Sequence, residues 1–350
     1  MRIIVDVMGG DNAPEELVKG AVSAAGIYEA DYILVGDKEA IEKTAEENSL
    51  DISGFEIVDA KGVVSMTDDP ISVVRKKADS SMVVGLKMLA EDKGDAFVST
   101  GNTGALFTAS TLIVRKLKGI KRAGIGAVLP LENPVLLLDS GANVTVTPEY
   151  LEDFAMMGSA YMKKAFGIEE PRVGLLNNGS EECKGTELQT EAYKLLKANR
   201  NINFVGNIEG NRVTRNECDV LVADGFTGNI LLKSIEGVGK LMLGSMKGLF
   251  YKDIKTKLAG LMVKKYVGEM KRKFDPAEHG GAPFLGFRKP VIKAHGNSKA
   301  KAFENAIRQA HAYAVSGVID DIAAAALDMR EKRKSESSQN EEMRGENENG

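Results

Sequence analysis

The feature that most constrains the fold of this 350-residue chain is a repeated succession of short apolar segment, polar turn and helical segment. Residues 3–7, 32–35 and 55–59 have the composition of buried strands, and residues 15–25 and 38–47 between them have helical periodicity. Strands that alternate with helices in this way form a mostly parallel sheet with helices on both faces. The sequence therefore predicts an α/β fold of this layered kind.

The same pattern continues through the rest of the chain. Residues 96–98, 124–129, 135–139, 173–176 and 220–222 have the composition of further strands, most of them followed by a polar turn rich in glycine. Ligands on such sheets gather at the carboxyl ends of the strands. We therefore expect the polar turns to carry the function. Asn12 and Ser298 stand where they could cap the helices that follow them.

Composition narrows the class of function. The chain is 43% hydrophobic with a net charge of -4, so it can bury a large core and has no general attraction for nucleic acid. Its two cysteines, Cys183 and Cys218, have no CxxC or paired Cys/His spacing, which argues against a disulfide framework or structural zinc and fits a reducing cytoplasm. The N-terminus is charged too early for a signal peptide, and no apolar run reaches the roughly 20 residues of a membrane span.

Several polar turns carry groups that bind an anion. In the turn at 99–104, glycines, hydroxyl groups and unpaired N–H groups precede a helix start, and this combination suits a phosphate. Asp6 and Asp11 stand at another strand end, where they either face a ligand or only close a hydrogen-bonded turn. A basic cluster at 75–77 is either a solvated helix face or a contact for an anionic substrate. If the turns converge at one sheet edge, they form one pocket rich in N–H donors.

Five of these motifs, in this order, carry a specific resemblance. MGGDNAP at 8–14, STGNTGA at 99–105, LDSGAN at 138–143, LLNNGSEECKGTE at 175–187 and ADGFTGN at 223–229 resemble the bacterial phosphate acyltransferase family over about residues 1–327. The resemblance implies transfer of a long-chain acyl group from acyl carrier protein to inorganic phosphate, which gives acyl-phosphate for phospholipid synthesis. It also implies a homodimer and a Rossmann-like three-layer α/β/α sandwich related to phosphotransacetylases and to isocitrate and isopropylmalate dehydrogenases.

The chemistry of that reaction needs no cofactor, metal or covalent enzyme intermediate. Phosphate, with a second pKa of about 6, is largely dianionic near neutral pH and can attack directly, and a thiolate leaves readily. The site must position the anion and stabilise a tetrahedral oxyanion. We reject Cys183 as a nucleophile because no base lies near it in the sequence.

We expect Lys184 to bind phosphate and the developing negative charge, and Asn229 with Asp224 to shape the acyl and phosphate side. His279, in a glycine-rich loop, could protonate the leaving group, His295 is a weaker candidate, and His311 is most simply structural. The predicted catalytic residues are Lys184, Asn229, His279 and Asp224. The predicted substrate-binding residues are Asp6, Gly9, Gly10, Asp11, Ser99, Thr100, Gly101, Asn102, Thr103, Gly104, Asp139, Gly141, Asn143, Asn177, Asn178, Gly179, Gly225 and Gly228.

Residues 230–273 differ from the rest, because apolar residues at helical spacing alternate with lysines. Such a basic amphipathic segment can lie in a membrane interface, or it can bury its apolar stripe against a dimer partner. Because the family product is a lipid intermediate passed to a membrane glycerol-3-phosphate acyltransferase, we favour peripheral contact with the inner face of the cell membrane. The predicted membrane contacts are Ile254, Leu258, Leu261 and Met262.

Two other functions compete with acyl transfer. An NAD-dependent dehydrogenase of the related isopropylmalate dehydrogenase-like fold is disfavoured because no GxGxxG motif opens the first strand–helix unit. A membrane adaptor without catalysis would leave the polar turns merely structural. We predict one catalytic α/β domain over residues 1–327, with the helical segment inside it, and a disordered tail over 328–350, where charged and polar residues cannot hold a fold.

Overall fold

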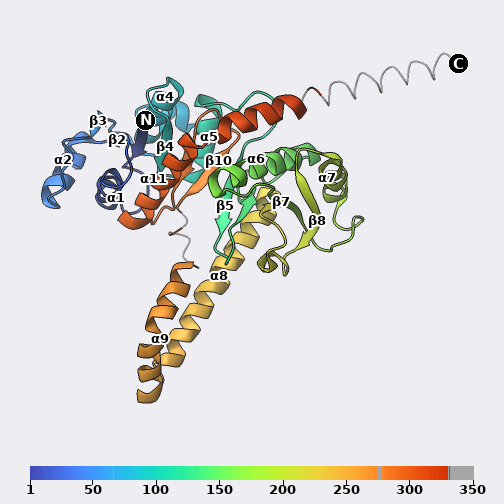
Figure 1. The fold of residues 1–350 in the computed structure, drawn as a ribbon. Coiled ribbons are helices and arrows are strands. Elements are labelled where there is room, and N and C mark those ends of the chain that lie inside the picture. The colour runs from blue at the N-terminus through green and yellow to red at the C-terminus, as the bar shows by residue number, and fades with distance from the viewer. Residues whose placement is uncertain (66, 274–277, 279, 330, 332–350) are drawn as a thin grey trace, which may run out of the picture.

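The computed structural model describes residues 1–350 except 66, 274–277, 279, 330 and 332–350. Its strands alternate with helices through most of the chain and form a sheet with helices on both faces (Figure 1). The described strands are β1 (Arg2–Asp6), β2 (Asp31–Gly36), β3 (Glu56–Asp59), β4 (Ala96–Ser99), β5 (Gly124–Leu129), β6 (Val135–Leu138), β7 (Arg172–Asn177), β8 (Asn203–Glu209), β9 (Val220–Val222), β10 (Ala282–Leu285) and β11 (Val291–Lys293).

The helices form the two outer layers of the predicted three-layer sandwich. The described helices are α1 (Glu15–Ala25), α2 (Lys38–Glu47), α3 (Val73–Lys76), α4 (Ser81–Ala90), α5 (Thr103–Ile113), α6 (Pro148–Phe166), α7 (Glu187–Ala198), α8 (Gly225–Phe250), α9 (Ile254–Lys273) and α11 (Ala300–Val315), and residues 318–329 are also helical. One core cluster joins α1, α6, α7 and α11 to one face of the sheet. Two further clusters join α4 and α5, and then α8, to the other face.

The sheet is mixed, which the sequence did not indicate. Its strand order is β3-β2-β1-β4-β11-β10-β5-β6-β9-β7-β8. The strands from β3 to β11 in this order pair in parallel, and so do those from β6 to β8. Between these groups, β10 is antiparallel to both β11 and β5, and β5 is antiparallel to β6. Seven of the ten strand pairings are parallel, so the prediction of a mostly parallel sheet is confirmed, but the two parallel groups run in opposite directions.

Strand periodicity explains how the faces are covered. Ile3 and Val5 point into the core beneath α1 and α11, while Ile4 points to the opposite face beneath α4. The predicted bounds of α1 and α2 are confirmed at both ends. In each helix an apolar stripe faces the sheet and charged residues face solvent, which is the pattern that identifies them in the sequence.

The turn after β1 is fastened to the turn after β11. The Asn12 side chain donates to the carbonyl oxygens of Asn297 and Ser298 at 3.0 and 3.2 Å, and it does not cap α1. The N–H of Ala300, in the first turn of α11, donates to the Glu16 carboxylate at 2.8 Å, so Ser298 is not the cap of α11. Both capping predictions are wrong, because these polar groups bind across the sheet edge instead of within their own helices.

Helices α8 and α9 form a hairpin that projects from the body of the protein (Figure 1). Large apolar side chains are exposed along it, with Ile254 77% and Met262 82% accessible to solvent. Helix α8 begins at Gly225, five residues before the predicted segment, and its first turns pack against the body before the hairpin projects. Within the described residues, no helix combines the length and hydropathy that crossing a membrane requires.

The described C-terminal helix continues past the predicted start of the tail. Asn201 donates to the Asp328 carboxylate at 2.7 Å, and Met329 is only 5% exposed within the core. Packing therefore extends through Met329. Most of the tail predicted over 328–350 lies outside the described residues.

Candidate active site

Three polar side chains occupy neighbouring positions on β1, β4 and β11. The strand register places Val5 beside Val98 and Ser99 beside Lys293, so Ser99 stands between Asp6 on one side and Lys293 on the other. Each side chain follows by two residues an apolar one in the core beneath α4 and α5, and therefore points to that same face. Ser99 Oγ donates to Asp6 at 2.6 Å, and Lys293 Nζ donates to the carbonyl oxygens of Thr100, at 3.1 Å, and of Ala294.

Lys293 is a cation in a nearly dry place, at 8% exposed. Burial lowers its pKa to about 8, although the carboxylates of Asp6 and Asp11 act in the other direction. Burial likewise raises the pKa of Asp6 against the hydrogen bonds that it accepts. The sequence analysis missed Lys293. The one available signal was a lysine that ends an apolar strand directly before the turn at 294–298.

The start of α5 offers unused donors. The Asn102 side chain accepts from Ala105 N–H at 2.9 Å and so caps the helix with a neutral group. Within the described part of the chain, the N–H groups of Thr103 and Gly104 have no acceptor, and both residues are exposed. A positive helix end with free N–H groups attracts an anion.

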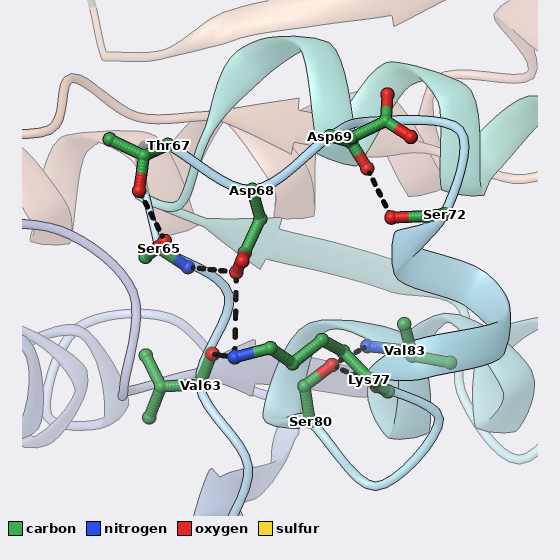
Figure 2. A network of polar contacts seen from close by, with 9 residues as sticks. All are labelled: Val63, Ser65, Thr67, Asp68, Asp69, Ser72, Lys77, Ser80 and Val83. Carbon is green, nitrogen blue, oxygen red and sulfur yellow. Dashed lines mark hydrogen bonds and ion pairs between the residues drawn. The ribbon is translucent and has the colours of Figure 1, made fainter.

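A loop braced by one lysine lies beside this helix start (Figure 2). Lys77 Nζ donates to Val63 O at 3.0 Å and pairs with Asp68 at 3.5 Å, while Asp68 accepts from Ser65 N–H at 2.7 Å. A β-carbon placed on Gly104 would lie 3.3 Å from Cγ of Pro70 in the same loop. Of the basic cluster at 75–77, Lys77 is therefore used to hold the loop.

The start of α8 is built differently. The Asp224 carboxylate accepts from Phe226 N–H at 3.0 Å and from Thr227 N–H at 2.9 Å, and so places a negative charge at the positive end of this helix. Gly228 lies so close to Asp139 that a β-carbon on it would be 2.0 Å from the Asp139 carbonyl oxygen. The first turn of α8 is thus packed tightly and already neutralised.

The loop 139–143 uses its polar side chains internally. The Asp139 carboxylate accepts from the N–H groups of Ile125, Gly141, Ala142 and Asn143 and from the Asn143 side chain. Burial raises the pKa of Asp139 against these bonds. Gly225 N–H donates to Asn143 O at 2.8 Å, which ties this loop to α8. Asp139, Asn143 and Gly225 therefore build the loop, and their polar groups are already paired.

Unlike the polar side chains of Asp139 and Asn143, the Asn229 amide has no hydrogen-bond partner among the described residues. Its Nδ2 atom would lie 2.9 Å from a β-carbon placed on Gly141, and the residue is exposed. One turn further along α8, Lys233 pairs with Glu236 at 2.9 Å. Burial and the positive charges of Lys233 and Lys293 lower the pKa of His295, so His295 lies near both the end of β11 and α8.

Residues from both parallel groups therefore flank β10 and β5 on one face of the sheet. On this face Ala127 and Ala282 are only partly buried, so the helices on either side leave this part of the sheet incompletely covered. The α5 start, Lys293 and His295 approach from one side, and Asn229 and Lys233 from the other. We take this region as the candidate active site.

The loop 177–187 lies apart from the candidate active site. Asn177 accepts from Asn178 N–H at 2.8 Å and donates to Lys184 O at 3.1 Å, and the Lys184 side chain is exposed. The loop follows β7, which is two strands beyond β6 and runs opposite to β4. The prediction that all polar turns share one sheet edge is wrong, because the antiparallel pairing of β5 with β6 reverses the strand direction. Gly179 lies against Lys184 in this loop, and His279 lies outside the described residues.

The remaining predicted residues cluster around the first turn. Positions next to Gly9 and Gly10 are filled by Gly101, Thr100 and the carbonyl oxygen of Gly296, so these glycines permit close backbone contact. Asp11 N–H donates to Gly296 O at 2.8 Å. Within the described ranges, no three His, Cys, Asp or Glu side chains group as metal ligands would.

The chain shares its α/β fold with phosphotransacetylases. A phosphotransacetylase from Streptococcus pyogenes superposes with a TM-score of 0.61 at 16% identity, covering 90% of this chain and 94% of the other. A 4-hydroxythreonine-4-phosphate dehydrogenase from Klebsiella pneumoniae shares the fold with a TM-score of 0.52 at 12% identity, covering 89% and 98%.

Sequence comparison identifies the family. The family model described as "Fatty acid synthesis protein" matches residues 1–321. A phosphate acyltransferase from Acetivibrio thermocellus is 45% identical over 326 residues, which are 92% of this chain and 95% of the relative. The chain belongs to the phosphate acyltransferase family, and it is an acyltransferase that uses phosphate as acceptor. The resemblance of the five motifs to the phosphate acyltransferase family is confirmed. The likeness to the Klebsiella pneumoniae dehydrogenase is one of fold alone.

Proposed function

We propose that the protein transfers a long-chain acyl group from acyl carrier protein to inorganic phosphate and so supplies acyl-phosphate for phospholipid synthesis. The observation that carries this proposal is the start of α5, where free N–H groups of Thr103 and Gly104 stand behind a neutral cap. At the start of α8, by comparison, Asp224 would repel a phosphate. The buried cation of Lys293 holds the turn at Thr100 beside the α5 donors.

In the proposed reaction, a phosphate oxygen attacks the thioester carbonyl carbon. The resulting oxyanion collapses, the C–S bond breaks, and the thiolate of the carrier leaves and takes a proton from solvent or from a nearby acid. Hydrogen-bond donors that are already in place can stabilise such an oxyanion without reorganisation. The unpaired Asn229 amide is our candidate for this donor. Burial and neighbouring lysines lower the pKa of His295 and favour its neutral form, so we expect solvent to supply the proton.

Lys184, Asn177, Asn178 and Gly179 stay a prediction for binding substrate, since they lie on an exposed loop outside the candidate site of this chain. Asp224 and Asp139 support the site through the loop and helix that they hold. No cofactor or metal is required by this scheme.

Product identification tests the function. The purified protein is incubated with long-chain acyl carrier protein and labelled phosphate, and the label is followed into a species that hydroxylamine converts to the acyl hydroxamate. We expect label in acyl-phosphate and release of free carrier only when phosphate is present. Release without phosphate, or turnover of NAD with no phosphate dependence, would contradict the proposal.

The hairpin supports a second, separate proposal, which is peripheral contact with the inner face of the cell membrane. Leu258, Leu261 and Met262 on α9 are exposed, and Lys264 and Lys265 follow them. There an acyl-phosphate would be delivered to a membrane glycerol-3-phosphate acyltransferase. We expect Leu258→Glu with Met262→Glu to abolish sedimentation with anionic vesicles, while Ile71→Glu, an equally exposed apolar site away from the hairpin, leaves it unchanged.

A homodimer is the other proposed use of exposed apolar surface. Phe226 and Ile230, at the inner end of α8, are exposed beside the body of the protein. Light scattering of the Phe226→Ser, Ile230→Ser variant should show monomers where the wild type shows dimers. A hairpin variant that becomes monomeric while vesicle binding persists would assign α9 to the dimer instead of the membrane.

A further inference from the structure

The loop between α5 and β5 holds a dense group of cations that form no salt bridge with any residue the structure describes. Residues 115–122 read RKLKGIKR, with five cations in eight residues and no acidic residue. None of the five forms a salt bridge with another described residue, whereas Lys77 in the basic cluster at 75–77 and Lys164 beside Lys163 each form one. In a chain with a net charge of -4, this local reversal of sign marks a surface for an acidic partner.

Buried hydrogen bonds fix the backbone of this loop, so its charged side chains extend from a defined position on the surface. Leu117 N–H donates to Gly286 O at 2.9 Å, and Lys121 N–H donates to the buried Asp153 carboxylate at 2.7 Å. Ile120 is buried, and Gly119 has a positive φ of 100° where it packs against Ala326. Because the anchors are buried, Arg115, Lys118 and Lys121 are left exposed on the outer side.

Neighbouring elements extend the charged surface. The exposed Arg288 donates its N–H to Arg115 O at 3.1 Å, which brings a sixth cation to the loop. Leu112, in the last turn of α5 and three residues before Arg115 in the chain, is 53% exposed. Cations around a few exposed apolar side chains are what an acidic helical protein can recognise.

The loop also lies at one end of the candidate active site. Arg122 Nε donates to Asn143 Oδ1 at 2.6 Å, and β5 then begins at Gly124 and runs through the incompletely covered part of the sheet. The six residues of β5 extend about 20 Å. A long flexible prosthetic arm that enters beside Arg122 can therefore follow β5 towards the α5 start.

The hairpin makes a membrane an unsuitable partner for this loop. Helix α8 begins next to the loop 139–143 and crosses Leu137 and Leu129 on its way out, so it leaves the sheet at the opposite edge from residues 115–122. The exposed apolar end of the hairpin and the cation loop thus point to different sides of the protein. A flat surface that holds one of them does not reach the other.

We propose that residues 115–122, with Arg288 and Leu112, form the docking surface for the acidic carrier protein that brings the acyl thioester. This inference rests on the proposed function, because it names where that donor binds. Attraction between such surfaces acts mainly on encounter and affinity, so it falls with ionic strength and leaves the chemical step unaltered.

The test reverses two exposed charges, in the variant Lys118→Glu with Lys121→Glu. Exposed charges each contribute modestly, so loss of two attractions and gain of two repulsions should raise the KM for acyl carrier protein about tenfold, with kcat unchanged. Turnover of a small acyl-pantetheine thioester should stay at the wild-type rate. The matched control is Lys163→Glu with Arg200→Glu, which reverses two exposed cations that form no salt bridge elsewhere on the protein.

Each outcome decides the inference. A wild type that acylates phosphate from both donors, together with an unchanged KM in the Lys118, Lys121 variant, would overturn the docking surface and leave the function standing. A wild type that acylates phosphate from neither donor would overturn the function itself. Loss of vesicle binding in the variant at an unchanged KM would make the loop a membrane contact and overturn the inference. The milder Lys118→Ala, Lys121→Ala variant, expected to raise KM by a smaller factor, keeps the test valid if the reversal impairs folding.

Discussion

The starts of α5 and α8 look alike in sequence and differ in what they can bind. Each follows a buried strand and a polar turn, and in the first turn of each helix a threonine precedes a glycine. At α5 the cap is the neutral Asn102 and Gly104 is exposed, whereas at α8 the cap is the Asp224 carboxylate and Gly228 is pressed against Asp139. The comparison teaches that a glycine turn at a helix start is an anion site only when the protein has not already supplied its own anion.

The largest effect should come from the glycine at α8. A β-carbon at Gly228 would lie 2.0 Å from a backbone oxygen that cannot move aside cheaply, so Gly228→Ala should lower the free energy of unfolding by about 3 kcal/mol or more. The matched Gly104→Ala should cost far less, because its β-carbon would meet only the Pro70 side chain, at 3.3 Å, and a helical alanine is favoured by up to about 1 kcal/mol over glycine. Urea denaturation measures both. Equal stabilities would show that the two helix starts are packed alike.

The next effect concerns the cap at α5. Asn102→Asp can keep the capping hydrogen bond but puts a negative charge where we place phosphate, and repulsion at such a distance should raise the KM for phosphate about tenfold to a hundredfold. Steady-state kinetics at fixed ionic strength measures it. An unchanged KM would move the phosphate away from α5.

The ionisation of Lys293 predicts how phosphate binding near the α5 start depends on pH. Its pKa of about 8 in the folded chain means that the ammonium, which favours an anion at the adjoining turn, is lost as pH rises through about 8. We expect kcat/KM for phosphate to fall severalfold over this range in the wild type and to stay level in Lys293→Arg, which remains charged. Lys293→Met should be low and level. If kcat/KM for phosphate still fell above pH 8 in Lys293→Met, the titrating group would be a different residue.

The same residue gives a stability prediction of known sign. The folded chain binds fewer protons than the unfolded chain between about 8 and the ordinary value of 10.5. This group therefore lowers stability below pH 8, and its penalty is relieved as pH rises towards 10.5. Chemical denaturation of wild type and Lys293→Met at pH 7.5 and 10 should show the wild type gaining on the variant. No relative change would mean that Lys293 is not desolvated.

The smallest effect should come from the cap at α8. Asp224→Asn keeps a capping side chain and loses only its charge, so the free energy of unfolding should fall by about 0.3–1 kcal/mol. The KM for phosphate should be unchanged, which makes this variant the control for Asn102→Asp. A KM shift as large as that of the α5 variant would remove the distinction between the two helix starts.

The sequence predicted the elements whose apolar pattern is regular. The bounds of α1, α2, β5 and β9 follow from periodicity, and the ordered motifs led to the family. The hairpin β10–β11 was missed, because its strands are short and Pro283 and Pro290 lie in and beside them. The reversal of strand direction itself comes from the antiparallel pairing of β5 with β6, two strands whose positions were predicted but whose relative direction was not.

Site residues were harder to judge from sequence for a physical reason. The sequence pattern of a carboxylate at a strand end is the same whether it binds a ligand or backbone N–H groups. Only the folded chain shows that Asp139 is fully paired. Lys293 gave the opposite error, since a lone lysine in an apolar strand does not disclose that it is buried.

The continuous sheet has one more consequence. The floor of the candidate site is made of β10 and β5, which are hydrogen-bonded to each other and to the strands on either side. The two flanks therefore cannot swing apart as separate lobes unless this ladder of backbone hydrogen bonds is broken. The site can therefore open during turnover only by movement of the helices and loops that lie over β10 and β5, and such movements displace only a small part of the protein.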